Sequence, residues 1–350
     1  MKINKYKYIS LDKFVNKVLY DKKNGYYMNK NPIGKKGDFI TAPNVSILFS
    51  EMVAIWCISF WENLASPKKI NIVELGGGNG EMMYRMIKVF ERFPKFKKSS
   101  NYFILEKSQL LKKIQRKKLV SHKVTWINSL NKLKDEPSLF LANEFFDSLP
   151  IKQFVKKKNI WFEKKVKKIN SQKFELVDVI TNIKNLEQKI GIDLSNNQKI
   201  IEFSPLSYKY LNIICKKINI FQGGLLIFDY GYLEKKMKNT LQSIYKHKFN
   251  NILEKLGKSD ITYNISFYLL KKIVNKLKLK VAGLTTQKKF LTRLGILQRA
   301  EILTRNLLFS KKADIYYRLS RLIDNRFMGK LFKVMFVTKN KNKFKLGFKN

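Results

Sequence analysis

Residues 70–93 combine an apolar run, a glycine-dense turn and an amphipathic stretch, an arrangement suited to holding a ligand. The run over 70–75 predicts a strand, Gly76, Gly78 and Gly80 form the turn, and residues 81–93 predict a helix. Such strand-turn-helix units bind cofactors in α/β folds, because glycine lets the backbone approach a ligand without a Cβ clash.

The spacing of these glycines narrows the choice of cofactor. A dinucleotide fingerprint needs G-x-G-x-x-G, and its third glycine would fall on Glu81. Glu74 precedes the turn, and Glu106 ends the next apolar run. Two carboxylates at these places are typical of S-adenosylmethionine, which has an ammonium group at one end and ribose hydroxyls at the other. The alternative is a tight turn without a ligand.

A second polar group follows the predicted strand 138–142. Asn143, Glu144 and Asp147 would lie at the carboxyl edge of a parallel sheet, where ligands bind in open α/β folds. Carboxylates there could orient a guanidinium and stabilise its charge during methyl transfer, so we take all three as catalytic candidates. The alternatives are a turn cap ahead of Pro150 for Asp147 and a structural hydrogen bond for Glu144.

The elements that would position these residues form an α/β fold. Strands predicted at 70–75, 102–106, 123–127, 138–142 and 224–229 alternate with helical segments, which implies a mostly parallel sheet. Helices are predicted at 11–20, 44–64, 206–218, 266–276 and 287–309, and residues 331–337 predict an edge strand. We divide the chain into an N-terminal helical or lid segment (1–66), a cofactor-binding half (67–150), a β insertion (151–200), a second core half (201–338) and a basic tail (339–350).

The charge of the chain is extreme: 71 Lys and Arg against 26 Asp and Glu give +45 in 350 residues. The lysines are spread along the whole chain, which does not resemble the clustered patch of a nucleic-acid binder. We therefore attribute the excess to compositional drift and expect no nucleic-acid partner. Attraction to an acidic protein or to anionic lipid is the alternative.

Several residue classes argue against other functions. Cys57 and Cys215 lie in apolar helical contexts and are expected to be reduced thiols. With only His122 and His247 and no Cys/His cluster, we expect no metal site. The apolar stretch 47–61 is shorter than the roughly 20 residues that span a bilayer. No signal peptide is evident, so we expect a bacterial-type cytoplasmic protein, or a mitochondrial matrix protein if the host is eukaryotic.

Four segments together resemble one family. They are G-D-F-I-T-A-P (37–43), V-E-L-G-G-G-N-G (73–80), A-N-E-F-F-D-S-L-P (142–150) and D-Y-G (229–231). The chain resembles the MidA-type methyltransferases, the family that includes the mitochondrial complex I assembly arginine methyltransferase. It departs from the family pattern at Gly77, usually proline, and at Asn44, usually acidic.

The resemblance implies a class I methyltransferase sheet of seven strands with the last one antiparallel. It implies S-adenosylmethionine as cofactor, a lid role for the 37–43 loop with Asp38 and Thr41 near the cofactor, and arginine methylation of a protein partner. That partner would be a respiratory complex I subunit or its assembly intermediate. Two alternatives stay open: an assembly factor that binds the cofactor without turnover, and an RNA or DNA methyltransferase. The [ND]-P-P-[YF] motif of base-amine methylases is absent after strand 138–142, where the chain reads N-E-F-F.

Overall fold

The computed structural model describes residues 8–34, 37–38, 40–170, 173–246 and 248–349. Its centre is a mixed sheet whose strands are, in spatial order, β15 (Lys280–Thr286), β16 (Phe332–Thr338), β10 (Gly223–Tyr232), β5 (Ser138–Asn143), β2 (Ile70–Leu75), β3 (Ser100–Leu105) and β4 (Val124–Ile127). The short β14 (Ile265–Ser266) pairs with the end of β10 and makes the eighth strand. The predicted α/β class is confirmed, but the sheet has eight strands where seven were expected.

Strands β10, β5, β2, β3 and β4 run parallel, whereas β16 is antiparallel to both of its neighbours. The parallel strands are mostly apolar because helices cover both faces of the sheet. In β5, Leu139 and Leu141 join one core cluster, and Phe140 and Ala142 join the other.

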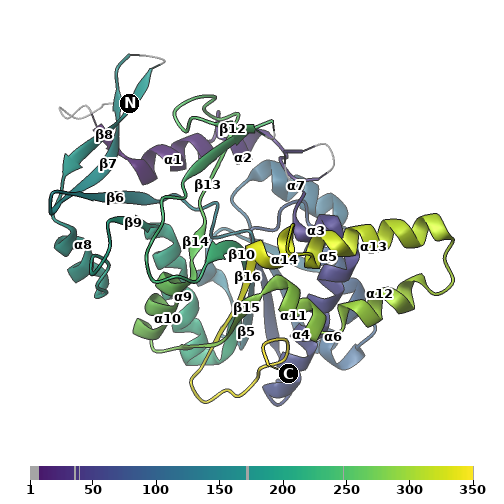
Figure 1. Cartoon of the computed structure of the whole chain (residues 1–350). Helices are drawn as coiled ribbons and strands as arrows, with labels where there is room; N and C mark the ends of the chain where they lie inside the picture. Colours follow the sequence, from purple (N-terminus) through teal and green to yellow (C-terminus); the bar gives the residue numbers. More distant parts are fainter. Residues whose placement is uncertain (1–7, 35–36, 39, 171–172, 247, 350) are drawn as a thin grey trace.

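Helices lie on both sides of the sheet (Figure 1). One face is covered by α4 (Ile47–Asn63), α5 (Glu81–Phe90), α6 (Pro94–Ser99), α11 (Gln287–Arg293), α12 (Ile296–Thr304) and α13 (Phe309–Ile323). The other face is covered by α9 (Pro205–Phe221) and α10 (Phe267–Lys276). Within the described residues, every helix is too short or too polar to cross a bilayer.

Two further sheets lie beside this core. The first contains β1 (Tyr8–Ser10), β6 (Lys152–Lys157), β7 (Ile160–Lys168), β8 (Phe174–Ile180) and β9 (Ile200–Phe203). Helix α8 (Ile183–Ile190) connects β8 to β9. The second contains β11 (Gln242–Tyr245), β12 (Lys248–Asn250) and β13 (Asp260–Thr262). Helix α1 (Leu11–Tyr20) joins them, because its apolar face packs with Val166 of β7 and Ile261 of β13. The shorter elements are α2 (Tyr26–Asn29), α3 (Ala42–Val45), α7 (Gln109–Lys118), the 3-10 turn η1 (Leu130–Lys132) and α14 (Met328–Leu331).

Two local predictions are wrong. Residues 331–337 were expected at an edge, yet β16 lies between β10 and β15. Strand β15 was not predicted from the sequence. It is half-buried, begins with a lysine and has an irregularity between Val281 and Gly283, so it lacks a clear alternating pattern. The predicted helix 287–309 is broken at Gly295, whose φ of +85° starts α12.

The basic C-terminal segment packs onto the core. Phe348 is buried, and the indole Nε1 of Trp56 donates a hydrogen bond to the carbonyl of Leu346 at 3.0 Å. Both cysteines are buried free thiols. The two further sheets lie above the carboxyl ends of the parallel strands in the view of Figure 1.

Candidate active site

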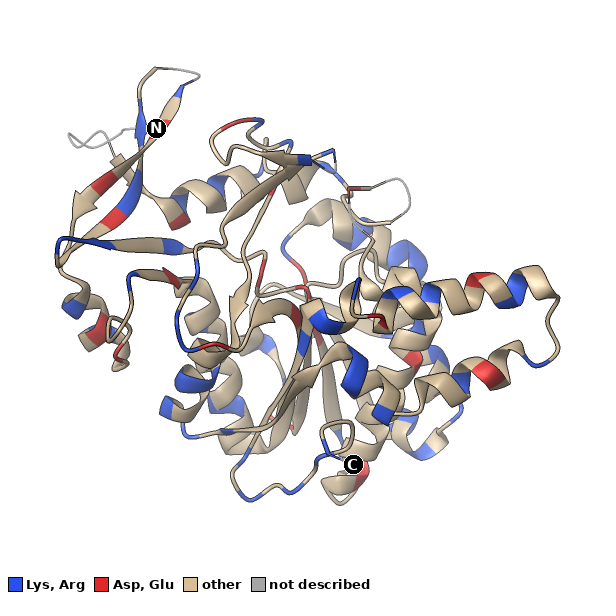
Figure 2. Cartoon of the chain, in the orientation of Figure 1, with Lys and Arg blue, Asp and Glu red and all other residues tan. Residues whose placement is uncertain are grey.

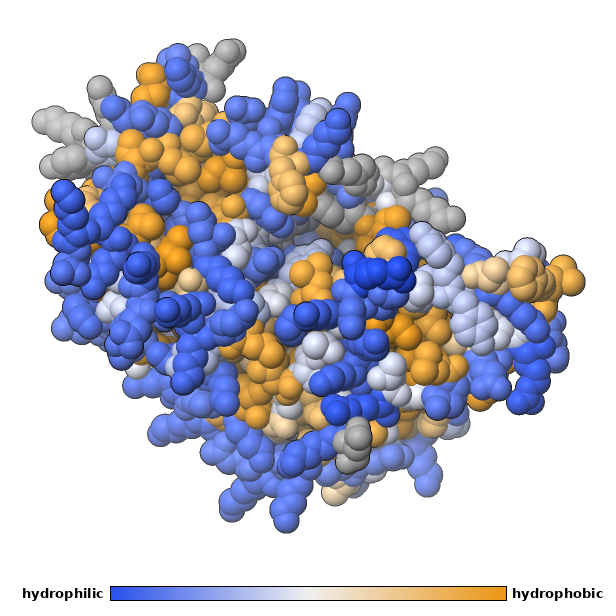
Figure 3. Space-filling model, in the orientation of Figure 1, coloured by the Kyte–Doolittle hydropathy of each residue, from blue (hydrophilic) through white to orange (hydrophobic). Residues whose placement is uncertain are grey.

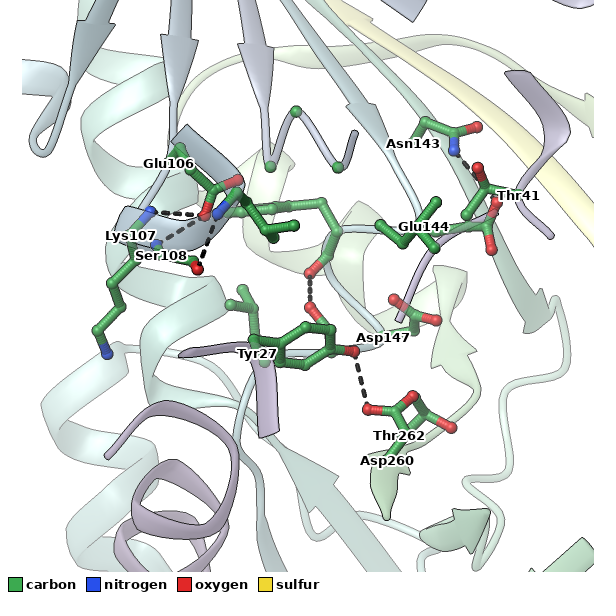
Figure 4. Close-up of a pocket in the computed structure, with 18 of the residues that line it drawn as sticks. Tyr27, Thr41, Glu106, Lys107, Ser108, Asn143, Glu144, Asp147, Asp260 and Thr262 are labelled. Carbon is green, nitrogen blue, oxygen red and sulfur yellow. Dashed lines mark hydrogen bonds between the residues drawn. The ribbon is translucent and has the colours of Figure 1, made fainter. Parts of the chain in front are cut away.

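A cavity of about 850 Å³ lies where the parallel strands end. Figure 4 shows Glu106 and Lys107 on one side of it, Asn143, Glu144 and Asp147 on the other, and Tyr27 and Asp260 lower in the view. This volume falls in the range of roughly 300–1,000 Å³ that small-molecule sites occupy. We call the two sides the cofactor end and the acceptor end.

The cofactor end is built on the turn between β2 and α5. Gly76, Gly78 and Gly80 have φ angles of +70°, +52° and +79°, which L side chains rarely adopt. Gly76 and Gly78 line the cavity, whereas Gly80 lies at the N-cap of α5 and is not among its lining residues. A Cβ on Gly78 would lie 3.0 Å from the Cδ1 atom of Ile33, so there is little room for a side chain.

Glu74 brings an unsatisfied carboxylate to this end. It is buried near the end of β2, lines the cavity, and its Oε2 atom has no hydrogen-bond partner among the described residues. Burial, with the neighbouring charge of Glu106, raises the pKa of Glu74 to about 8. A cationic group placed here would satisfy the free oxygen and favour the ionised carboxylate.

Glu106 is fixed in orientation instead. Its Oε1 atom accepts from the backbone amides of Lys107 and Ser108, both at 2.8 Å. Its Oε2 atom accepts from Gln115 Nε2 at 3.0 Å. Burial raises the pKa of Glu106. An oriented carboxylate at this strand end suits paired hydroxyls, as the sequence predicts.

Gln115 is a positioning residue that the sequence analysis missed. Its fully buried amide also donates to the carbonyl of Gly78 at 2.8 Å and accepts from Trp126 Nε1 at 2.8 Å. One side chain thus joins the glycine turn to Glu106. A polar position at helical spacing in α7 gave no signal that would distinguish it from a surface residue.

The loop before α4 closes over the glycine turn. Asn44 and Asn79 exchange amide hydrogen bonds of 2.7 and 3.4 Å, and the hydroxyl of Thr41 accepts from Asn44 at 2.9 Å. Thr41 lines the cavity, as expected for a lid residue. Asp38 does not line it: Tyr26 donates to its carboxylate at 2.6 Å and Lys30 pairs with it. Phe39 of the same motif lies outside the described residues, as does His247.

The acceptor end begins where β5 finishes. Glu144 has a φ of +51°, a strained value for a residue with a side chain. Its carboxylate accepts from Ala42 N at 3.3 Å, Asn143 Nδ2 at 3.2 Å and Tyr230 OH at 2.9 Å. Burial raises the pKa of Glu144 to about 6. The structural hydrogen bond considered from the sequence therefore exists, and Glu144 ties α3 to the cavity wall that it also forms.

Asp147 is more available to a ligand. It is buried, lines the cavity, and its Oδ1 atom has no partner among the described residues. Burial and the charges of Asp229, Glu144 and Asp260 raise its pKa. Asp229 does not line the cavity. Its carboxylate accepts hydrogen bonds from the backbone amides of Phe146, Asp147 and Tyr230 at 3.0–3.3 Å, which fixes the turn that carries Asp147.

Asp260 comes from the second insertion and is absent from the predicted site. It lines the cavity, and its Oδ1 accepts from Tyr27 OH at 2.8 Å. Burial raises its pKa to about 7. Phe145 also lines the cavity, whereas Phe146 is fully buried in the core. No motif spacing could place Tyr27 beside Asp260, since 233 positions separate them.

Comparison with known proteins decides the family. Residues 52–285 match the family described as "Putative S-adenosyl-L-methionine-dependent methyltransferase". The chain belongs to this family. S-adenosylmethionine is its cofactor, and the MidA-type resemblance is confirmed. The orphaned oxygen of Glu74, the glycine turn and the fixed Glu106 fit that cofactor.

Curated relatives cover most of this methyltransferase. Mitochondrial protein arginine methyltransferase NDUFAF7 of Xenopus laevis is 27% identical over 319 residues, spanning 84% of this chain and 72% of the relative. The Danio rerio protein of the same name is 26% identical over 347 residues, spanning 93% and 82%. The names of these relatives give no support to the expected cytoplasmic location.

Solved structures share the fold. A protein from Burkholderia thailandensis bound to S-adenosyl-homocysteine has a TM-score of 0.80 and 19% identity, covering 98% of this chain and 89% of that chain. A native crystal structure from the same organism gives a TM-score of 0.78 and 20% identity, covering 98% and 88%.

Proposed function

We propose that this methyltransferase acts on an arginine side chain of a protein partner. The observation that carries the proposal is the kind of polar atom left unsatisfied in the cavity. Three buried lining atoms have no partner among the described residues, and all are oxygens that only accept hydrogen bonds once the carboxyl groups are ionised: Glu74 Oε2, Asn143 Oδ1 and Asp147 Oδ1. Such atoms bind groups that donate hydrogen bonds. In an arginine methyltransferase the cofactor brings an ammonium group and the acceptor brings a guanidinium.

The cofactor end would hold S-adenosylmethionine through three features. Glu74 would pair with the ammonium group, Glu106 would accept from the ribose hydroxyls, and the turn from Gly76 to Gly78 would let the ligand pass close to the backbone. When bound, the cofactor supplies a methyl group on a sulfonium. Transfer of a methyl group from a sulfonium does not require a metal ion.

The acceptor end supports a guanidinium as the nucleophile. The carboxylates of Glu144, Asp147 and Asp260 line the cavity, and none has an ion pair among the described residues. A guanidinium would form charge-assisted hydrogen bonds with Asp147 and the carbonyl oxygen of Asn143, and Phe145 offers an aromatic wall.

The proposal also includes a route for the proton. The methyl group moves from sulfur to a guanidino nitrogen, the sulfonium becomes a neutral thioether, and the nitrogen loses one proton. A guanidinium holds its protons to a pKa above about 12, so a neighbouring base helps the transfer. Asp147 and Glu144 are the acceptors of that proton in this proposal. Asp147 is buried and Glu144 is half-buried, and a carboxylate shielded from water interacts more strongly with a cation.

The names of the relatives support a protein acceptor. The finer predictions, a respiratory complex I subunit as partner and a bacterial cytoplasmic or mitochondrial matrix location, remain part of this proposal. Figure 2 shows Lys and Arg on helices and strands in many parts of the described chain, a distribution that does not favour a clustered nucleic-acid site.

The proposal is tested with labelled S-adenosylmethionine added to a lysate of cells that lack the gene, with and without the purified protein. We expect label in a protease-sensitive band whose hydrolysate contains methylarginine. Label in nucleic acid, in a small metabolite or in another amino acid would contradict the proposal. Absence of transfer in every fraction, with normal cofactor binding, would favour a binding protein without turnover.

A further inference from the structure

The hairpin formed by α12 and α13 projects from the molecule and carries apolar side chains at its far end. Figure 1 shows it extending away from the central sheet, and Figure 3 shows apolar side chains gathered at its end, at the edge of the view. We call residues 302–313 the hairpin tip. Ile302, Leu308 and Phe309 there are 61%, 72% and 86% exposed. Tyr317, about two turns after Phe309 along α13, is 61% exposed.

The fold does not need these side chains at the tip. The inner face of α13 is held by Leu319 and Leu322, which are buried in the main core. Exposed apolar surface is unfavourable in water, and such surface gathered in one place usually marks an interaction site. The tip therefore has the composition of a contact surface without a partner in this chain.

The charges around the tip restrict what that partner is. Residues 302–313 contain Arg305, Lys311 and Lys312 and no acidic residue. None of these three cations has an ion pair among the described residues. The flanking acids are Glu301 and Asp314, and the latter pairs with Arg318 at 2.7 Å.

A second copy of the chain is disfavoured as the partner, because two molecules of net charge +45 repel each other. A convex tip of leucine and phenylalanine next to unpaired cations matches the two-part chemistry of an anionic bilayer. Apolar and aromatic side chains enter the region between headgroups and acyl chains, while lysine and arginine stay at the phosphates.

We propose that the hairpin tip inserts into the surface of an anionic lipid bilayer and holds the methyltransferase there. The contact is peripheral, since α13 has 15 residues and no described helix can span a bilayer. The base of the hairpin packs near the cavity, because Arg318 of α13 donates to the carbonyl of Val45 in α3, next to the lining residues Pro43 and Asn44. This proposal does not depend on which group is methylated.

The test is flotation of the whole protein with vesicles of equal parts phosphatidylglycerol and phosphatidylcholine, compared with vesicles of phosphatidylcholine alone. We expect binding to the anionic vesicles, reduced on the order of tenfold or more in the double variant Leu308→Ser/Phe309→Ser. Phe249→Ser is the matched control, because Phe249 is 81% exposed on β12 and away from the tip. It should bind like the wild type. Binding of S-adenosyl-homocysteine verifies that each variant is folded.

A second measurement does not depend on the folding of the double variant. In Phe309→Trp, the tryptophan emission contributed by position 309 should shift to shorter wavelength when anionic vesicles are added, relative to the unsubstituted protein. Equal vesicle binding by the double variant, binding to neither vesicle, or an unshifted emission would overturn the proposal. A double variant that binds vesicles normally but loses methyl transfer to a protein in a vesicle-free lysate would assign the tip to a protein partner instead.

Discussion

The two ends of the cavity are built in different ways. The carboxylates and glycines of the cofactor end come from one continuous stretch, from β2 through α7, and the contacts of Gln115 within it join residues fewer than 40 positions apart. The acceptor end is assembled from α2, α3, the end of β5, β10 and β13, with Tyr27 and Asp260 233 positions apart. Local sequence therefore encodes the chemistry of the first end, whereas the second depends on how the insertions pack over the sheet.

The ends also differ in how their carboxylates are held. Glu106 has three donors and Glu144 has three donors, so both are fixed by the protein. Glu74 and Asp147 each have one buried oxygen without a partner among the residues that the structure describes. Each end thus pairs one fixed carboxylate with one that is open to a cation. Substitutions that affect one end and spare the other would sharpen this comparison.

The largest effect is expected from Gly78→Val. A β-branched residue at φ of +52° is strained, and its side chain would press on Ile33 and enter the cavity. Calorimetric titration with S-adenosyl-homocysteine should show affinity reduced about 100-fold or more, equivalent to roughly 2.7 kcal/mol.

Gly295→Val is the control for that variant. Gly295 has a φ of +85°, but only Gln298 Oε1 lies near its missing Cβ, at 3.6 Å. It should lose stability and keep cofactor affinity. Equal loss of affinity in both variants would show that strain, and not occupation of the cavity, is responsible.

A smaller effect is expected from Gln115→Leu. The change removes the donor shared by Gly78 and Glu106, so both groups lose their orientation. Affinity for S-adenosyl-homocysteine should fall about tenfold, or roughly 1.4 kcal/mol. Trp126 loses its acceptor as well, and its emission should change. Gln287→Leu removes an equally buried amide far from the cavity and should leave affinity unchanged. Similar affinities in the Gln115 variant and the wild type would refute the positioning role.

The mildest effect is a dependence on pH. With its pKa raised to about 8 by burial, Glu74 of the ligand-free protein holds a proton at neutral pH. A cationic ligand favours the ionised form, so binding releases a proton and affinity should rise severalfold from about pH 5.5 to 7.5. Glu74→Gln should flatten that slope in the same titrations. A wild-type affinity that falls with rising pH, or a slope that the variant retains, would contradict the role of Glu74.

The sequence was sufficient where local pattern carried the information. The run 70–75 forms β2 as predicted, Gly76, Gly78 and Glu106 line the cavity beside it, and the segment 142–150 contributes lining residues opposite them. Asp260 was not predicted as a site residue because a three-residue strand in an insertion has no periodicity of its own. Gln115 was not predicted because its role depends on Trp126 in β4 and on Glu106 at the end of β3.

Two predicted cofactor residues do not line the cavity. The carboxylate of Asp38 bonds to Tyr26 and Lys30 instead. Gly80 lies at the left-handed start of α5. The burial of Phe348 and the position of β16 depend on packing between distant segments, which charge and hydropathy along the chain do not reveal.

The central claim is that the acceptor end recognises a cation separately from the cofactor end. It is tested most directly in Asp147→Asn, by measuring both affinity for S-adenosyl-homocysteine and the single-turnover rate of methyl transfer to the protein acceptor found in the lysate. The account predicts an affinity within about twofold of wild type and a rate reduced about 100-fold, because the lost charge acts mainly on the reacting guanidinium. A wild-type rate, or a loss of rate matched by an equal loss of cofactor affinity, would contradict it.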